Sequence, residues 1–266
     1  NIFADSMKTV DPLIKIGAVI YRHDGVYNDW SKKVLSKVEN KADFLIIHNY
    51  FRRKPNPNNV TYQEMLTSLG QVQQDVNRVK NMVASYTNKP SDYFPIAITE
   101  FNSKTGEREI SMANAIFITQ ALGEQIKNGF AASILWSFQN GLDSHGGDHG
   151  MTARNSSVLP DHYPRPVFYI YHFFQKFMGD RLIWSYSSDT AVKSYASKFS
   201  SDTRGIILVN NSSNFKTVDL DLGSDTMRYN YYWYEVYANN ETDKKIFING
   251  QTSNFNEGGP ENYASI

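Results

Sequence analysis

Apolar stretches and amphipathic stretches alternate along roughly the first two thirds of the chain. Four of the apolar stretches are short and nearly continuous, which is typical of parallel strands that are buried on both faces. Amphipathic stretches follow them, and the clearest, residues 60–86, carries an apolar side chain every three or four positions. This alternation predicts βα units, in which helices connect the strands of a parallel sheet. The strands are expected at residues 13–21, 44–48, 94–99 and 131–138, and further helices at 110–127 and 168–178.

From about residue 181 the apolar positions recur every second residue, in short stretches separated by Ser, Asn, Asp and Gly. Short alternating stretches without a helical pattern predict an antiparallel β-sandwich. We therefore expect an α/β domain over residues 1–180 and an all-β domain over residues 181–266, with the all-β domain incomplete. The expected strands of this second domain include residues 192–197, 205–210, 217–222, 231–237 and 245–248.

Composition narrows the classes of protein that fit this pattern. The 266 residues include 27 Lys and Arg, 27 Asp and Glu, 14% aromatic residues and no Cys. The apolar content excludes a disordered chain, and the absence of Cys excludes disulfides and thiolate zinc sites. Because the formal net charge is zero, we expect neither nucleic acid nor an anionic membrane as a partner. No apolar stretch approaches the ~20 residues that a membrane-spanning helix needs.

Side chains suited to chemistry follow three of the expected strands at their carboxyl ends. In a parallel sheet these ends meet at one edge, where the active sites of α/β folds are built. His48 and Tyr50 are two residues apart, so they share a face of an extended segment. A carboxylate, polar donors and a flat aromatic face together are typical of a sugar-binding site. The side chains expected at this edge are Glu100, His48, Tyr50, Asn102, Trp136 and Asn140.

Each of these residues also has a plainer interpretation. Glu100 alone fits a solvated carboxylate or the partner of an arginine. His48 alone fits a hydrogen-bonded structural group, and Trp136 alone fits a core residue. Their combination at one edge of the sheet favours the sugar site over these separate interpretations.

A glycine-rich loop, residues 141–150, is the second candidate region. His145, Asp148 and His149 have side chains that can bind a divalent ion. No other strand clearly offers a further ligand, and a glycine-rich loop needs no metal to be ordered, so we expect no metal and no other cofactor. We expect instead that Asp148 and His149 line the sugar-binding cleft.

Taken in order, these segments resemble the second half of a clan A retaining glycoside hydrolase. In detail they are most similar to the bacterial enzymes of the family 51 and family 39 group, which includes α-L-arabinofuranosidases, xylosidases and endoglycanases. The resemblance covers most of residues 1–180 and, more loosely, the rest; its motifs indicate the clan well and the substrate poorly. The motifs are His48-Asn49-Tyr50, Thr99-Glu100-Phe101-Asn102, Trp136, Phe3-Ala4-Asp5-Ser6-Met7-Lys8, Asp11-Pro12, Asp148-His149-Gly150-Met151 and Gly179-Asp180.

The resemblance implies the second half, strands five to eight, of a (β/α)8 TIM barrel, followed by the antiparallel β-sandwich. It implies that Glu100 is the nucleophile of a double displacement and that Tyr50 holds and polarises it. His48 and Asn102 would bind sugar hydroxyls, and Trp136 would form the floor of the subsite for the cleaved sugar.

The acid/base carboxylate of this family belongs to an Asn-Glu pair at the end of barrel strand four. That strand would precede the helix in which this sequence begins at Asn1. The pairs Asn240-Glu241 and Asn256-Glu257 are expected in the β-domain and in a turn, so neither fits the role. We therefore expect the acid/base and the missing N-terminal half of the barrel to lie upstream of residue 1, and this piece alone to be inactive.

The expected substrate is a neutral plant or algal polysaccharide of the arabinan, xylan or β-glucan type, and the expected location is secreted or periplasmic in a bacterium. One alternative is a non-catalytic carbohydrate-binding protein on a degenerate barrel. Another is a self-contained four-stranded α/β protein with an appended sandwich. This second alternative is the less favoured of the two, because its first and fourth strands would be long, apolar strands with one edge unpaired.

Overall fold

The computed structural model forms two compact units, each described here by itself. The first unit comprises Asn1–Gly106 and Gln120–Phe138, and the second comprises Glu107–Thr119 and Gln139–Ile266. This division differs from the domain boundary near residue 180, which stays a prediction. Asn1, where we expect the interior of a helix, lies outside the described residues. The structure describes residues 2–38, 40–51, 53–223 and 231–266.

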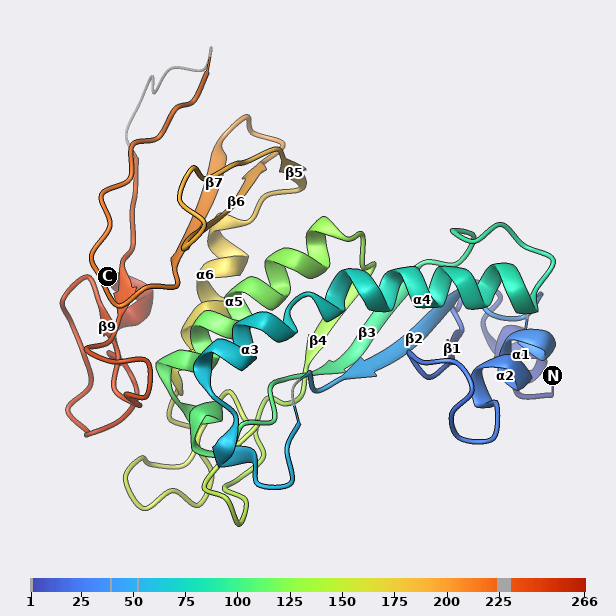
Figure 1. The fold of residues 1–266 in the computed structure, drawn as a ribbon, viewed down its shortest axis with the longest axis horizontal. Coiled ribbons are helices and arrows are strands. Elements are labelled where there is room, and N and C mark those ends of the chain that lie inside the picture. Colours follow the sequence, from blue (N-terminus) through green and yellow to red (C-terminus); the bar gives the residue numbers. More distant parts are fainter. Residues whose placement is uncertain (1, 39, 52, 224–230) are drawn as a thin grey trace. The chain divides into compact units, whose positions relative to one another are not determined.

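A parallel sheet of four strands forms the centre of the first unit (Figure 1). The strands lie in sequence order, and each is hydrogen-bonded to the next. Leu45, Ile47 and Ile98 on the two inner strands are at most 2% exposed, as expected for strands with neighbours on both sides. The prediction of an α/β unit built on a parallel sheet is therefore confirmed. The strands are β1 (Gly17–Val19), β2 (Phe44–Asn49), β3 (Ile96–Phe101) and β4 (Ala132–Leu135).

The outer strands, β1 and β4, each pair with a single strand among the described residues, so this sheet is open. β1 is shorter than the predicted strand at 13–21. Leu13 is 84% exposed, and Ile14 N donates to Asp11 O in a turn. Only the three residues of β1 pair with β2. The assignment of the four strands to barrel strands five to eight stays a prediction.

Helices α1 (Ile2–Val10), α2 (Trp30–Val38), α3 (Tyr62–Ser68) and α4 (Gln71–Tyr86) complete the first unit, with a short 3-10 helix, η1 (Pro57–Asn59). Figure 1 shows α4 running along the sheet, and α2 contacts both α4 and β1. Its Leu35 is completely buried, as is Leu45 on the sheet. Among the described residues of the whole chain, no helix combines the length and apolar character needed to cross a bilayer.

The helix predicted at residues 60–86 is two helices in the structure. Thr61 caps the first, because its Oγ1 accepts from Glu64 N and its own N–H donates to the Glu64 carboxylate. The first helix ends where Leu69 N donates to Leu66 O in a tight turn. Gly70 lies at the break, and glycine in a helix interior costs about 1 kcal/mol relative to alanine. The single apolar stripe of the sequence therefore spans two helices.

The helices of the second unit include η2 and α6. η2 (Gly106–Ile110) precedes α5 (Met112–Lys127), whose residues belong partly to each unit. α6 (Pro166–Phe177) begins two residues before the helix predicted at 168–178, with proline at its first position, where proline forfeits no helical hydrogen bond. η3 (Tyr263–Ser265) lies near the end of the chain.

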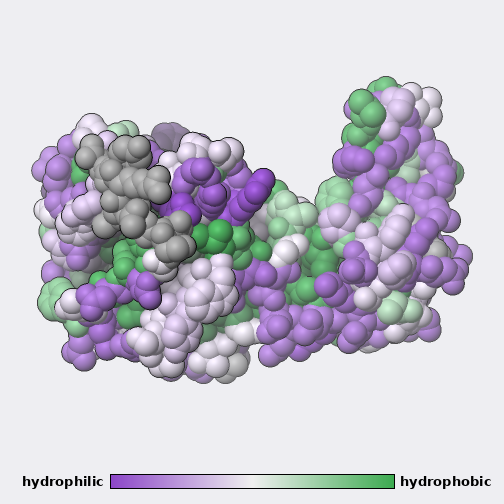
Figure 2. Space-filling model, turned by 90° about the horizontal axis from the view of Figure 1, so that it is seen from above, coloured by the Kyte–Doolittle hydropathy of each residue, from purple (hydrophilic) through white to green (hydrophobic). Residues whose placement is uncertain are grey.

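Two antiparallel sheets follow α6 in the second unit. The predicted strand at 217–222 is wrong, since these residues pair with no strand among the described residues and Val218 and Leu220 are exposed. Exposed apolar residues are not confined to this segment: Figure 2 shows hydrophobic patches between hydrophilic residues on the face that it draws. The antiparallel character is confirmed, and the sandwich stays a prediction. The strands are β5 (Arg181–Ile183), β6 (Val192–Lys198) and β7 (Arg204–Asn210) in one sheet, and β8 (Val236–Tyr237) and β9 (Phe247–Ile248) in the other.

Candidate active site

Glu100 lies near the carboxyl end of β3, where the strand leaves its buried part. Its side chain is 30% exposed, and the side chain of His48 beside it is 38% exposed. Tyr50 Oη donates a hydrogen bond of 3.0 Å to Glu100 Oε2, and His48 Nδ1 lies 3.5 Å from the same oxygen. Among the described residues, none donates to Glu100 Oε1. The carboxylate is thus held through one oxygen, and the other is left for a ligand.

A β-bulge in β3 brings Glu100 to this position. Ile47 pairs with Ile98, but the next residue of β2, His48, pairs with Glu100, so Thr99 is an extra residue. The register of β3 against β4 also shifts between Ile98 and the end of the strand. Because a shift of one residue exchanges the two faces of a strand, the bulge places Glu100 on the same face as His48. Thr99 Oγ1 lies 3.0 Å from His48 Nε2 and so contacts the other nitrogen of the imidazole.

The phenol of Tyr50 stays protonated well beyond neutral pH. Burial raises its pKa, and the hydrogen bond to the negatively charged Glu100 raises it further, whereas the nearby charge of Arg53 opposes the shift. A protonated phenol is a hydrogen-bond donor. Tyr50 therefore remains a donor to Glu100 Oε2 at any pH at which a glycosidase works.

A buried polar network lies behind the end of β2. Asn49 is 2% exposed, and its Nδ2 donates to Asp75 Oδ2 at 2.8 Å while its Oδ1 accepts from Phe51 N at 2.6 Å. Asp75, also 2% exposed, forms an ion pair of 3.0 Å with Arg22. Phe51 has a φ of 48°, which is unusual for a residue other than glycine. The network therefore fixes the turn that directly follows Tyr50.

Asn102 and Trp136 come together at the ends of β3 and β4. Asn102 is 1% exposed, and its Nδ2 donates to Trp136 O at 2.7 Å. The side chain of Trp136 is 44% exposed, and the peptide bond to Ser137 is cis. The first unit thus brings Glu100, Tyr50 and His48 together, and it uses Asn102 to link two strand ends. The roles predicted for Asn102 and Trp136 in sugar binding stay predictions.

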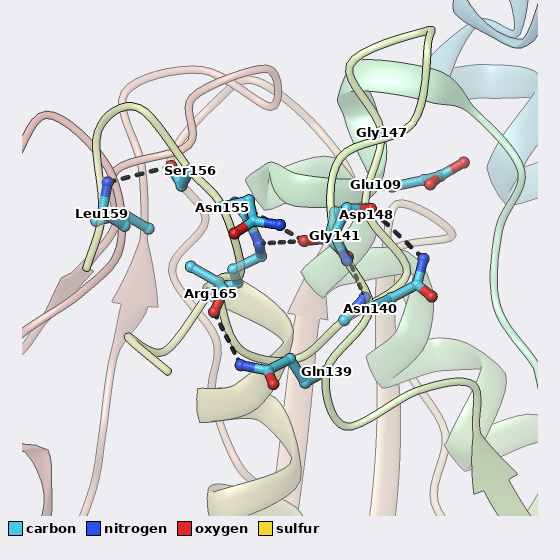
Figure 3. Close-up of polar contacts among 12 residues, drawn as sticks. Glu109, Gln139, Asn140, Gly141, Gly147, Asp148, Asn155, Ser156, Leu159 and Arg165 are labelled. Atoms are coloured by element: carbon cyan, nitrogen blue, oxygen red, sulfur yellow. Dashed lines mark hydrogen bonds and ion pairs between the residues drawn. The ribbon is translucent and has the colours of Figure 1, made fainter. Parts of the chain in front are cut away.

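Two other predicted residues, Asn140 and Asp148, belong to the second unit (Figure 3), and so does His149. Asp148 has a fully buried carboxylate that forms a 3.0 Å ion pair with Arg165 Nη2. Its Oδ1 accepts from Gly141 N at 3.0 Å and from Gly150 N at 2.7 Å. These contacts close the glycine-rich loop and give Asp148 a structural role. Sugar binding by Asp148 stays a prediction, and the burial of its carboxylate argues against it.

His149 also has a partner that the sequence did not suggest. Its Nε2 lies 3.4 Å from Oε2 of Glu109, a residue of η2 that is 3% exposed. Neither Glu109 nor Arg165 follows an expected strand, so neither was a candidate. In the part of the chain that the structure describes, no three His, Asp or Glu side chains gather as ligands of a metal ion.

Comparison of the sequence with known protein families and with curated proteins finds no match. Solved structures do match. They include an α-L-arabinofuranosidase from Thermotoga maritima in complex with arabinose, which is 17% identical, has a TM-score of 0.58, and is matched over 78% of this chain and 45% of that one.

Two further matches have similar statistics. A family 51 α-L-arabinofuranosidase from Bifidobacterium longum is 14% identical with a TM-score of 0.57, over 79% of this chain and 48% of that one. CelM2, a bifunctional glucanase-xylanase from a metagenome library, is 15% identical with a TM-score of 0.56, over 80% of this chain and 47% of that one. The chain therefore spans a little under half the length of these proteins. Its fold is similar to part of the folds of these two arabinofuranosidases and this glucanase-xylanase, in agreement with the resemblance carried by its motifs.

Proposed function

We propose that this chain is the second half of the catalytic barrel of a retaining glycoside hydrolase together with a β-domain, and that Glu100 is its nucleophile. The observation that carries the proposal is the geometry of Glu100 at the carboxyl edge of the parallel sheet. One of its oxygens is held by Tyr50, and the other has no donor among the described residues. The likeness in fold to family 51 glycosidases supports the same conclusion.

The proposed reaction is a double displacement. Glu100 Oε1 attacks the anomeric carbon while an acid residue, supplied from upstream of this chain, protonates the leaving oxygen. The bond to the leaving sugar breaks, and a glycosyl ester of Glu100 forms. The same upstream residue then takes a proton from water, which attacks the anomeric carbon and restores the Glu100 carboxylate with net retention. This mechanism requires the two carboxyl groups to lie about 5 to 5.5 Å apart.

Residues around Glu100 support these steps. Tyr50 fixes the carboxylate by a charge-assisted hydrogen bond, which directs Oε1 toward the substrate. His48, beside the same carboxylate and partly exposed, is proposed to bind a sugar hydroxyl. The exposed part of the Trp136 indole is proposed to stack on the C–H face of the sugar. For Asn140 and His149, which belong to the second unit, a sugar-binding role stays a prediction from the sequence.

The proposed substrate has a neutral polysaccharide backbone of the arabinan, xylan or β-glucan type. The structural matches are described as acting on such glycans, as an arabinofuranosidase and a glucanase-xylanase. A polymer of this kind is degraded outside the cell that uses it, so we keep the proposal of a secreted or periplasmic bacterial enzyme.

Substitution of Glu100 in the complete protein tests the proposal. Glu100→Ala is expected to abolish sugar release, and azide is expected to restore it, because a small anion can take the place of the carboxylate at the anomeric carbon. Glu124→Gln is the control, since Glu124 lies on α5 in an ion pair with Lys127 and has no role in the site. A near-normal rate for Glu100→Ala contradicts the proposal. Glycan binding without sugar release by the unaltered complete protein would instead support the non-catalytic alternative.

A further inference from the structure

Arg53 carries an unsatisfied positive charge beside the proposed nucleophile. It follows Tyr50 by three residues and is exposed, and its Cζ lies 5.3 Å from the centre of the Tyr50 ring. Among the described residues, no carboxylate or other acceptor pairs with this guanidinium. Within the described part of the chain, the Tyr50 ring is thus the one group that interacts with this charge.

The neighbouring cation has a different environment. Lys54 Nζ forms an ion pair of 2.7 Å with Glu64 and donates to Asn59 O at 2.8 Å. Its charge is therefore compensated within its own segment, and the charge of Arg53 is not. A purely structural role would predict partners for both cations.

The segment that carries Arg53 is held against the next strand end. Gly106 has a φ of +62° and lies so close to the Asn58 side chain that a Cβ atom would have no room. Residues 53–60 therefore pack against the segment that follows β3, whose last residues include Glu100. This contact joins the segment that carries Arg53 to the loop that follows β3.

A guanidinium is planar and can present two parallel N–H groups, which match a carboxylate or a sulfate in a bidentate arrangement. The ring that Arg53 contacts is the one whose hydroxyl donates to Glu100, so the guanidinium and the carboxylate share Tyr50 as a neighbour. A neutral hydroxyl would accept one hydrogen bond and leave the charge uncompensated.

We propose that Arg53 forms an anion-binding subsite beside Glu100, so that the substrate is a polysaccharide whose neutral backbone carries carboxylate or sulfate groups. The inference rests on the proposed function and names its substrate class. A uronic acid and a sulfate ester share the chemistry that Arg53 recognises, and the experiment distinguishes them.

The test compares matched substrates with the complete protein. One pair is xylo-oligosaccharides with and without a glucuronic acid branch, and the other is galactan oligosaccharides with and without a sulfate ester. Arg53→Gln is expected to lower kcat/KM for the anionic member of one pair by about tenfold, since it removes a charge-assisted hydrogen bond, and to leave the neutral member unchanged. The preference for the anionic member is expected to weaken at high ionic strength.

Lys89→Gln is the matched control. Lys89 Nζ lies 4.8 Å from the centre of the Tyr93 ring, so it is also a cation on an exposed aromatic side chain. It precedes β3, however, and so lies at the amino end of the strand whose carboxyl end carries Glu100. Its substitution is expected to leave the kinetics of both substrate pairs unchanged.

Two results would overturn the inference. An equal loss on neutral and anionic members shows that Arg53 acts only through Tyr50, and no loss on either shows that it has no role. The proposed function also allows arabinan and β-glucan, and it is tested separately by Glu100→Ala. If the complete protein hydrolyses none of the four, calorimetry on the Glu100→Gln variant decides the subsite. Tighter binding of an anionic member that Arg53→Gln abolishes supports the inference, whereas equal binding of neutral and anionic members contradicts it.

Discussion

Glu100, which follows an apolar run in the first unit, and Asp148, which lies in the glycine-rich loop of the second, are two carboxylates with opposite environments. Glu100 is partly exposed, and Tyr50 and His48 contact it through one oxygen only. Asp148 is buried, and both of its oxygens are engaged, by two backbone N–H groups and by Arg165.

This difference distinguishes a carboxylate that is available to react from one whose oxygens are fully used in stabilising the fold. A buried charge is tolerated only when a counter-charge and hydrogen bonds replace its lost hydration, and Asp148 has both. Glu100 keeps contact with solvent and one oxygen without a donor among the described residues, so it can change its bonding during a reaction at little cost. The comparison predicts that substitutions at Asp148 act on stability and that substitutions around Glu100 act on rate.

Asp148→Asn is expected to have the largest effect on stability. It leaves the Arg165 guanidinium buried without its closest counter-charge, and breaking one side of a buried ion pair costs about 3–5 kcal/mol. Urea unfolding followed by circular dichroism measures the loss. Asp143→Asn in the same loop is the control, because Asp143 is exposed and, among the described residues, its side chain accepts only from His145 N and Gly147 N, for which an amide oxygen can also serve as acceptor. A loss below about 1 kcal/mol for Asp148→Asn would contradict the structural role.

Tyr50→Phe is expected to act on rate in the complete protein. Removing the hydrogen bond to Glu100 costs about 1.5–3 kcal/mol, which corresponds to about a 10- to 100-fold lower kcat if the bond positions the nucleophile. The matched control is Tyr86→Phe, because Tyr86 Oη also donates to a carboxylate, that of Asp24, at 2.5 Å on the surface. Steady-state kinetics of both variants measure the effect. Equal rates for the two variants would show that Tyr50 does not position Glu100.

The sequence predicted the meeting of Glu100, Tyr50 and His48 because burial on both faces forces long apolar runs, and the polar residues after such runs lie at one sheet edge. It could not predict the bulge at Thr99, since an extra residue changes which side chains share a face without changing the composition of the strand. The partner of Asp148 was missed for a related reason. Arg165 is 17 residues away in the sequence, so no local pattern joins them.

The secondary structure shows the same limit: local patterns in the sequence predict an element, but pairing with distant segments sets where it begins and ends. The strands β2, β6 and β7 were predicted to within one residue at each end, because their apolar patterns are a local property. β8 is shorter than predicted: among the described residues, only Val236–Tyr237 of the predicted residues 231–237 pair with another strand. The helix break near Gly70 was visible in the sequence as a glycine but was outweighed by the continuous apolar stripe on both sides.

The smallest expected effect is on stability in alkaline solution, where Tyr50 of the first unit is compared with Tyr169 of the second. Burial is the main cause that raises the pKa of both Tyr50 and Tyr169, and the hydrogen bond to Glu100 adds to it for Tyr50. The unfolded chain loses these phenolic protons near pH 10, before the folded chain does, so their stabilisation is complete below about pH 10 and is lost as the pH rises further. Tyr169 is fully buried, whereas Tyr50 is half-buried. Urea unfolding between about pH 9 and 11 should therefore show a decline in stability that Tyr169→Phe flattens more than Tyr50→Phe; equal slopes in both variants and the unaltered chain would contradict this order.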